Sequence, residues 1–242
     1  MRISRVFTEH PLKADTTVTL DARATRYLGQ VLRLHAGDQI RLFDGSGRDF
    51  AGELARCDRK GCSVRITDVV STEPAAALQL HLGIGISRGE RMDFAIQKSV
   101  ELGVTAVTPL LTERSVVELR GERLERRIAH WRGVVISACE QSGRSRLPAL
   151  NPPAALGDWL KAHRQGLMLY HRAARNLPDL PHPGDSLNLL IGPEGGLSEP
   201  ERQAAMDAGF QGVRLGPRVL RTETAPLAAL AAIQALWGDF RA

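Results

Sequence analysis

The chain has 242 residues and 43% hydrophobic content, which is enough for a buried core in one large domain or in two modest ones. No run of about 18 apolar residues occurs, and the opening MRISRVFTEH lacks the apolar segment of a secretory signal. We therefore expect a cytoplasmic protein with no membrane span. The formal net charge is +5, and 28 of the 32 basic residues are arginines. Arginine's planar fork of donors suits phosphates and base edges, which favours a nucleic-acid partner, although a genome-wide preference for arginine would give the same count.

The three cysteines, Cys57, Cys62 and Cys139, are odd in number and show no C-x-x-C spacing. This pattern fits neither a disulfide framework nor a zinc ribbon. We expect three small buried thiols in a reducing compartment, and no metal.

The first 72 residues have the pattern of a small, mostly β domain. Apolar and polar residues alternate around Ile40 and Leu42 and again around Val64 and Ile66. Two turn clusters, at 44–47 and 58–61, separate these runs as in a meander or small barrel. One helix, ARATRYLGQVLRL, is expected within this part.

Beyond a short linker at residues 71–77, strands alternate with helices. The expected strands are LQLHLGIGI, VTAVTPLL, GLMLYHR, SLNLLIG and GVRLG, and a long amphipathic helix is expected from about residue 124 to 140. Strands separated by helices predict a parallel sheet covered on both faces, which is an α/β fold.

The stretch GIGISRGER resembles a dinucleotide fingerprint, because Gly83 and Gly85 end a strand ahead of a helix. Its third glycine is misplaced for G-x-G-x-x-G, so we favour the other reading, in which the glycines let another backbone pass close by. The sequence contains no P-loop, H-E-x-x-H or G-x-S-x-G pattern.

Polar side chains gather where the long helix ends, in ISACEQSGRSRLP. Glu140, Gln141, Arg144 and Arg146 follow one another around Gly143, a plausible helix C-cap. They form either a binding loop or an ordinary polar helix end, where arginines are favoured by the helix dipole.

The stretch LLIGPEGGLSEPE, residues 189–201, joins a buried strand to a helix that begins with a Ser198–Glu201 capping box. It therefore lies at the carboxyl end of a strand, where open α/β sheets bind their ligands. The glycine amides would suit a phosphate, but the carboxylate of Glu194 would repel one, so a cationic or neutral polar ligand fits better.

A second loop, LGPRVLRTETAPLAALAAIQALW, has the same setting after the strand GVRLG. It carries Arg218, Arg221, Glu223 and Thr224 and leads into a helix without charged residues between Ala225 and Trp237. So apolar a helix is expected in the core or across a subunit interface. Two such loops at the ends of successive strands predict one composite site.

These two loops follow ERMDFAIQKSVELGV and SACEQSGRSRLP, in order across residues 90–230, and QVLRLHAGD lies near the N-terminus. In these stretches the chain resembles the RsmE family. This family comprises 16S rRNA uracil-N3 methyltransferases of the SPOUT superfamily. The resemblance implies a small N-terminal PUA-like β-barrel for RNA over residues 1–72, and a C-terminal SPOUT domain over residues 73–242 with a mostly parallel sheet and a deep trefoil knot.

The resemblance also implies S-adenosylmethionine as the cofactor, 16S rRNA or the small ribosomal subunit as the partner, and a homodimer. Carried onto this sequence, the cofactor-binding residues are Leu169, Gly192, Glu194, Gly196, Leu215, Gly216, Leu220 and Thr224.

The implied reaction is attack by a uridine N3 on the methyl carbon of the cofactor, for which the N3 proton must be removed. Arg221 is the candidate to stabilise negative charge on the flanking carbonyl oxygens, and Glu194 or Glu223 to take the proton or orient that arginine. Gln141, Arg144 and Arg146 are the candidate RNA-binding residues.

Two other functions are compatible with parts of the sequence. A non-catalytic ribosomal RNA binding or assembly factor on the same scaffold would bind RNA without methyl transfer. A nucleotide-binding α/β enzyme built on Gly83 and Gly85 would bind NAD or ATP instead of S-adenosylmethionine.

Overall fold

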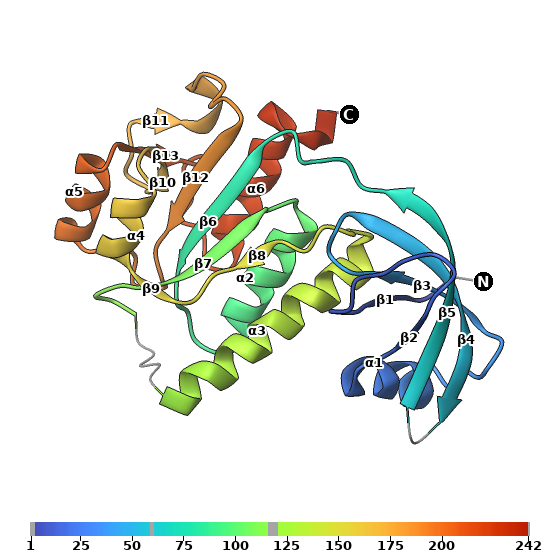
Figure 1. Ribbon diagram of the computed structural model, residues 1–242. Helices are drawn as coiled ribbons and strands as arrows, with labels where there is room; N and C mark the ends of the chain where they lie inside the picture. Colours follow the sequence, from blue (N-terminus) through green and yellow to red (C-terminus); the bar gives the residue numbers. More distant parts are fainter. Residues whose placement is uncertain (1–2, 59–60, 116–120, 242) are drawn as a thin grey trace. The chain divides into compact units, whose positions relative to one another are not determined.

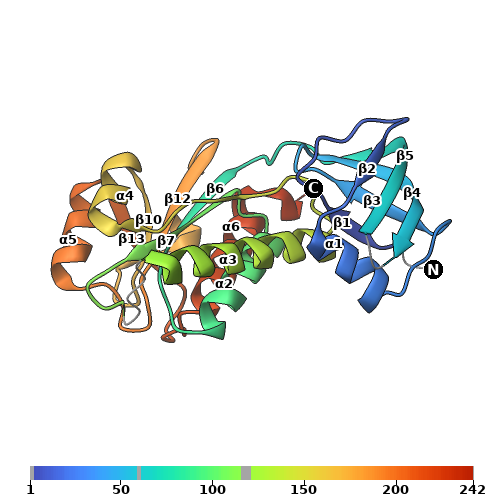
Figure 2. The same ribbon diagram turned by 60° about the horizontal axis from the view of Figure 1, so that its bottom comes forward.

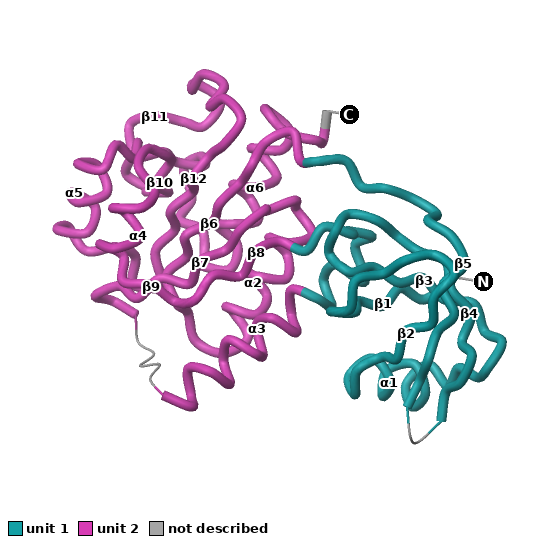
Figure 3. The backbone as a smooth tube through the Cα atoms, in the orientation of Figure 1, with its two compact units in different colours: residues 1–75, 136–147 teal, residues 76–135, 148–242 magenta. Residues whose placement is uncertain are grey.

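The computed structural model describes residues 3–58, 61–115 and 121–241. The chain divides into two compact units (Figure 3). Unit 1 comprises residues 1–75 together with 136–147, and unit 2 comprises residues 76–135 and 148–242. Nothing in the sequence pattern indicates that residues 136–147 belong with the N-terminal unit.

Unit 1 is mostly β-structure, as predicted. Its described residues form a five-stranded sheet in the order β1-β3-β4-β5-β2, in which only the β1–β3 pair is parallel. A short helix and a π-helical turn follow β2 and pack Leu28 into a core with Leu42, Leu54 and Val64. The elements are β1 (Arg5–Phe7), β2 (Thr17–Thr19), α1 (Ala22–Arg26) with the π-helical turn Tyr27–Val31, β3 (Gln39–Phe43), β4 (Arg48–Asp58) and β5 (Gly61–Thr72).

The prediction of three free thiols is wrong for two of them. Cys57 and Cys62 lie directly opposite each other on β4 and β5, with a Cα–Cα distance of 4.1 Å, and form a disulfide. Two cysteines on adjacent strands of a hairpin can form a disulfide when the strand register places them opposite each other. The cysteine spacings typical of disulfide frameworks and zinc ribbons do not reveal such a pair. Cys139 is free and buried, as predicted, and burial raises the pKa of its thiol to about 12.

Charged side chains attach residues 136–147 to the rest of unit 1. The buried carboxylate of Asp49 accepts hydrogen bonds from the Arg5 guanidinium (2.8 Å) and from the Ser145 hydroxyl (2.8 Å). Glu140 accepts from the Phe7 backbone amide (3.0 Å) and from Arg23 (2.8 Å). Each of these carboxylates therefore has at least one cationic partner.

Unit 2 contains a parallel sheet with helices on both faces, as the alternation of strands and helices predicts. In the described residues the order is β11-β13-β10-β12-β6-β7-β8, with β9 pairing to β7, and every pair is parallel. The strands are β6 (Gln79–Gly85), β7 (Ala106–Leu111), β8 (Ala149–Leu150), β9 (Ala154–Ala155), β10 (Gly166–Leu169), β11 (Arg175–Asn176), β12 (Ser186–Ile191) and β13 (Phe210–Arg214).

Figures 1 and 2 show α4 and α5 on one face of this sheet and α2 and α6 on the other. Trp159 and Leu160 of α4 form a core with Leu190 of β12 and Ala205 of α5. The long helix α3 starts in unit 2 and ends in unit 1. The helices are α2 (Glu90–Glu101), α3 (Gly121–Ser142), α4 (Leu156–Ala162), α5 (Glu199–Asp207) and α6 (Thr224–Trp237).

No helix among the described residues is long and apolar enough to cross a membrane. The trefoil knot stays a prediction.

The two glycines of the GIGIS strand have the packing role that the sequence favours. A Cβ atom on Gly85 would lie 2.4 Å from both the ring Cδ and the backbone nitrogen of Pro193, and one on Gly83 would lie 2.7 Å from the Trp159 ring. The glycines therefore let β6 lie against the loop after β12 and against α4, and the prediction of close approach is confirmed.

Substituting Gly85→Ala should destabilise the protein by about 1–3 kcal/mol, because the new methyl group overlaps the Pro193 backbone. Gly133→Ala is the matched control: Gly133 lies inside α3 with nothing within 4 Å of an added Cβ, so the change should be neutral or stabilising by about 0.5–1 kcal/mol. Urea unfolding of both variants measures the difference, and equal midpoints would contradict the packing role.

Candidate functional site

A cavity of about 570 Å³ opens at the carboxyl edge of the unit 2 sheet, where β10, β12 and β13 end. Its size is that of a small-molecule site. The two loops that the sequence predicts to share one site, residues 192–197 and 215–223, both line this cavity. The third wall is the end of β10 with Tyr170 and His171.

Most of the predicted cofactor-binding residues lie around the cavity. Gly216 and Thr224 are not among its lining residues; Thr224 begins α6, and its backbone amide donates to the Arg221 carbonyl (2.9 Å). The predicted residues that do line the cavity are Leu169, Gly192, Glu194, Gly196, Leu215 and Leu220.

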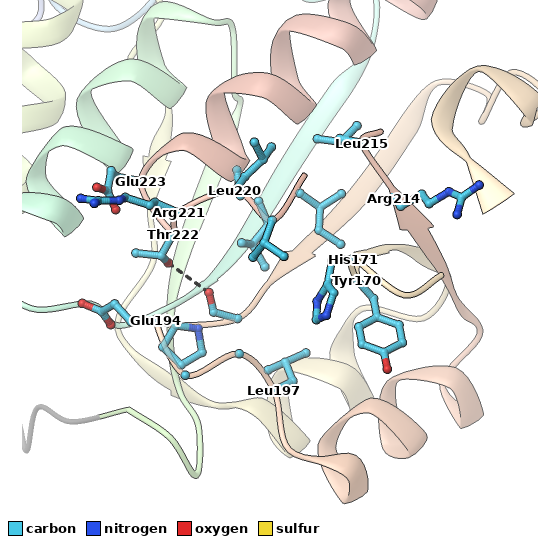
Figure 4. A pocket seen from close by; sticks show the side chains of 18 of the residues that line it. Tyr170, His171, Glu194, Leu197, Arg214, Leu215, Leu220, Arg221, Thr222 and Glu223 are labelled. Carbon is cyan, nitrogen blue, oxygen red and sulfur yellow. Dashed lines mark hydrogen bonds between the residues drawn. The ribbon is translucent and has the colours of Figure 1, made fainter. Parts of the chain in front are cut away.

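The cavity is lined by both apolar and charged side chains. Figure 4 shows Glu194, Arg221 and Glu223 on the left of the view, with Leu220 next to Arg221, and Arg214 on the right. A ligand that has both apolar and charged groups would match this lining.

A hydroxyl group ties the walls of the cavity together. The Thr222 hydroxyl donates to the Gly192 carbonyl (3.2 Å), the bond drawn as a dashed line in Figure 4. It also lies 3.3 Å from the Ser87 hydroxyl. Thr222 and Ser87 are only 8% and 4% exposed, so these bonds are shielded from water. One buried side chain thus joins the loops that follow β6, β12 and β13.

Glu194 faces the start of α2. Its carboxylate accepts from the Arg88 backbone amide (3.0 Å) and from the Arg91 guanidinium (3.3 Å). Partial burial acts to raise the pKa of Glu194, but these hydrogen bonds and the positive charge of Arg91 outweigh it, so the pKa lies below its ordinary value. A carboxylate with a lowered pKa is a weaker proton acceptor.

Two further contacts fix the loop around Glu194. The Arg114 guanidinium donates to the Gly195 carbonyl (2.8 Å). The Glu201 carboxylate accepts from the Glu113 amide (2.8 Å) and closes the predicted capping box with Ser198, which is confirmed. The loop between β12 and α5 is therefore held by the loops that follow β6, which is paired with β12, and β7, the next strand of the sheet.

Arg221 and Glu223 lie on the loop between β13 and α6. In the described part of the chain, neither side chain has a hydrogen-bond or ion-pair partner, and both line the cavity. Charged groups that line a cavity without partners are available to a ligand.

The three predicted RNA-binding residues belong to unit 1. Gln141 is exposed at the end of α3. The Arg146 Nε donates to the Glu73 carbonyl (3.1 Å), and the Arg144 Nε lies 3.8 Å from the Glu73 carboxylate. Both arginines therefore hold the chain after β5 through Glu73, a structural role that the sequence pattern did not predict.

Sequence reasoning missed Ser87, Thr222, Arg91 and Arg114 as parts of this site. Ser87 was detectable in principle, because it follows the end of β6 and so lies at the carboxyl edge of the sheet. Arg91 and Arg114 lie at the cavity because β12, β6 and β7 follow one another in the sheet. The pattern of apolar and polar residues does not reveal this strand order.

Comparison with known protein families finds an RNA methyltransferase domain over residues 74–234 and an RNA methyltransferase PUA domain over residues 20–67. Together with the fold, these matches define the class: an RNA methyltransferase domain preceded by a PUA domain. A curated relative, ribosomal RNA small subunit methyltransferase E of Buchnera aphidicola, is 33% identical over 98% of both chains.

Two solved structures extend the match over the full chain. A ribosomal RNA small subunit methyltransferase E from Neisseria gonorrhoeae bound to S-adenosylmethionine is 41% identical with a TM-score of 0.92, covering 99% of this chain and all of that one. A putative methyltransferase from Legionella pneumophila, also in complex with this cofactor, is 37% identical with a TM-score of 0.95 and the same coverage. This chain belongs to the ribosomal RNA small subunit methyltransferase E family, and the resemblance to the RsmE family is confirmed.

The lowered pKa of Glu194 predicts a pH-dependent contribution to stability. A carboxyl group with a lowered pKa stabilises the folded state above its unfolded pKa, near 4.5, and this stabilisation is lost as the pH falls through the folded pKa. Glu194→Gln should therefore reduce the unfolding free energy at pH 7 by about 1 kcal/mol or less, and by progressively less below pH ~4.5. Urea unfolding across pH tests this; a pH-independent difference would contradict it.

Proposed function

We propose that this protein transfers a methyl group from S-adenosylmethionine to N3 of a specific uridine in the 16S rRNA of the small ribosomal subunit. The observation that carries the proposal is the cavity at the carboxyl edge of β10, β12 and β13, in a chain 41% identical to a family member crystallised with this cofactor. Arg221 and Glu223 also line this cavity without a hydrogen-bond or ion-pair partner among the described residues, so both are available to act on a base bound there.

The cavity residues fit the cofactor by their chemistry. Leu169, Leu215 and Leu220 offer apolar contacts to an adenine ring, and Gly196 leaves open space, since nothing lies within 4 Å of a Cβ added there. Backbone groups of residues 192–196 offer partners to the polar groups of the ligand. When bound, S-adenosylmethionine supplies an electrophilic methyl group on a positively charged sulfur.

Glu223 is the better candidate of the two carboxylates to accept the uridine N3 proton. Glu194 is engaged by Arg88 and Arg91, and its pKa is lowered, whereas the Glu223 carboxylate has no partner in the described residues. A positioned base contributes about 100-fold to 10,000-fold to a rate. Glu194 then positions the loop between β12 and α5.

Arg221 would stabilise the negative charge that develops on the uracil carbonyl oxygens as N3 loses its proton. Its guanidinium is always charged at neutral pH and presents several donors, which suits two carbonyl oxygens flanking one nitrogen. Its place immediately before the buried Thr222 fixes its backbone relative to Gly192.

The remaining expectations concern the RNA and the assembly. We keep Gln141, Arg144 and Arg146 as proposed RNA-binding residues; the exposed Gln141 is the most available of them. We also propose a homodimer acting in the cytoplasm. One face of α6 is buried, with Ala229 and Ile233, while other apolar residues of this helix stay only half-buried, which suits a subunit interface.

The reaction is tested with small ribosomal subunits from cells that lack this gene. Purified protein and isotope-labelled S-adenosylmethionine should convert one uridine of the 16S rRNA to N3-methyluridine, detected by mass spectrometry of nucleosides. RNA binding without methyl transfer would favour the assembly factor, and label at a ribose oxygen or another base would overturn the N3 assignment.

The residue roles are tested by turnover and cofactor affinity together. Glu223→Gln and Arg221→Gln should each lower kcat by about 100-fold or more, because each removes a group that acts on the reacting base. The dissociation constant for S-adenosylmethionine should stay within a few-fold. Glu194→Gln is the comparison, with a smaller loss of kcat. Near wild-type turnover of Glu223→Gln and Arg221→Gln would contradict the roles assigned to these two residues.

A further inference from the structure

The cavity carries more positive charge than its proposed cofactor requires. Two carboxylates line it, those of Glu194 and Glu223. S-adenosylmethionine has one carboxylate, one ammonium and one sulfonium group, so its net charge is positive, and an excess of cationic side chains repels it. Six arginines line the cavity: Arg91, Arg114, Arg202, Arg214, Arg218 and Arg221.

Several of these arginines are occupied within unit 2. Arg91 is paired with Glu194, and Arg214 donates to Asn176 (2.9 Å). Arg202 pairs with Glu199 and lies over the Tyr170 ring, 4.9 Å from its centroid. The positive charges of these three arginines therefore already have partners within the protein.

Arg114 and Arg218 are different. Arg114 is bonded to the neutral carbonyl of Gly195, and Arg218 is exposed with no hydrogen-bond or ion-pair partner in the described residues. Neither charge is neutralised by a carboxylate within ion-pair distance among the described residues. Because β7 and β13 are parallel strands of one sheet, the loops that carry Arg114 and Arg218 both lie at its carboxyl edge.

We infer that Arg114 and Arg218 form an anion site at the mouth of the cavity, which holds backbone phosphates of the RNA next to the target nucleotide. The inference rests on the proposed function and places a phosphate contact in unit 2, in addition to the residues proposed in unit 1. Guanidinium groups bind phosphate oxygens through two parallel hydrogen bonds, and an RNA whose target base enters the cavity brings its own phosphates to the mouth.

The test compares Arg114→Gln and Arg218→Gln with Arg164→Gln. Arg164 is also exposed, but it precedes β10 and so lies at the opposite edge of the sheet. The probe is the small ribosomal subunit from cells lacking this gene, with its affinity measured by filter binding at several salt concentrations and its KM measured by methyl incorporation. Calorimetry gives the affinity for S-adenosylmethionine.

Arg114→Gln and Arg218→Gln should each weaken subunit binding several-fold. Each should also reduce the slope of log affinity against log salt concentration by about 0.7–0.9, the change expected when the counterions of one phosphate contact are no longer released. Cofactor affinity should stay within twofold, and Arg164→Gln should behave as the wild type. Arg218→Gln is the decisive variant, because the Arg218 side chain has no hydrogen-bond or ion-pair partner among the described residues.

Two results would overturn the inference: mouth variants that match Arg164→Gln in subunit affinity and salt slope, or variants that lose cofactor affinity instead, which would assign the arginines to the cofactor's carboxylate. A wild-type protein that binds subunits without methylating them would refute the proposed function. The filter-binding comparison still decides the inference in that case, because it does not depend on turnover.

Discussion

The site depends on one buried hydroxyl group. Thr222 bonds to the Gly192 carbonyl, 30 residues away in the chain, and to the Ser87 hydroxyl, 135 residues away, and so holds three loops together. Loops at the carboxyl edge of a parallel sheet have no ladder hydrogen bonds to fix them to one another. A bond within the buried interior is worth more than one at the surface. Its loss leaves the Gly192 carbonyl without this donor, while the Ser87 hydroxyl keeps its bond to the Gly85 carbonyl (3.4 Å).

Charge divides the site into parts with separate tasks. Glu194 is turned toward Arg88 and Arg91, which keeps its carboxylate ionised and its loop in place. Glu223 and Arg221 line the cavity, and neither side chain has such a partner in the part of the chain that the structure describes. Two carboxylates that line the same cavity thus differ in their environments, and the one with the fewer bonds is the one available for proton transfer.

The sequence predicted those helices, strands and caps whose formation depends on residues close together in the chain. The meander of β3 to β5, the long helix α3, the strands of the parallel sheet and the Ser198 capping box all follow from periodicity and from turn and cap residues. The meeting of the two loops at one cavity also followed, because strand ends and the loops after them are visible in the sequence.

What was missed depends on non-local neighbours. The Cys57–Cys62 disulfide follows from the register of β4 against β5, and the attachment of residues 136–147 to unit 1 follows from ion pairs across the fold. Arg144 and Arg146 show the same limit, since only the structure reveals Glu73 beside them. The RNA methyltransferase family was identified from the resemblance of long motifs. Periodicity alone would have predicted only a doubly wound sheet with a ligand-binding loop.

The affinity of the Thr222→Val variant for S-adenosylmethionine tests the three-loop site most directly. Valine keeps the shape of threonine but cannot bond to Gly192 or Ser87, so the loops lose their common tie, and the dissociation constant should rise about tenfold or more, which corresponds to about 1.4 kcal/mol. Thr222→Ser, which keeps the hydroxyl, should bind within about threefold of the wild type by the same reasoning. Wild-type affinity in the valine variant, measured by calorimetry, would contradict the role of Thr222 and with it the assignment of this cavity.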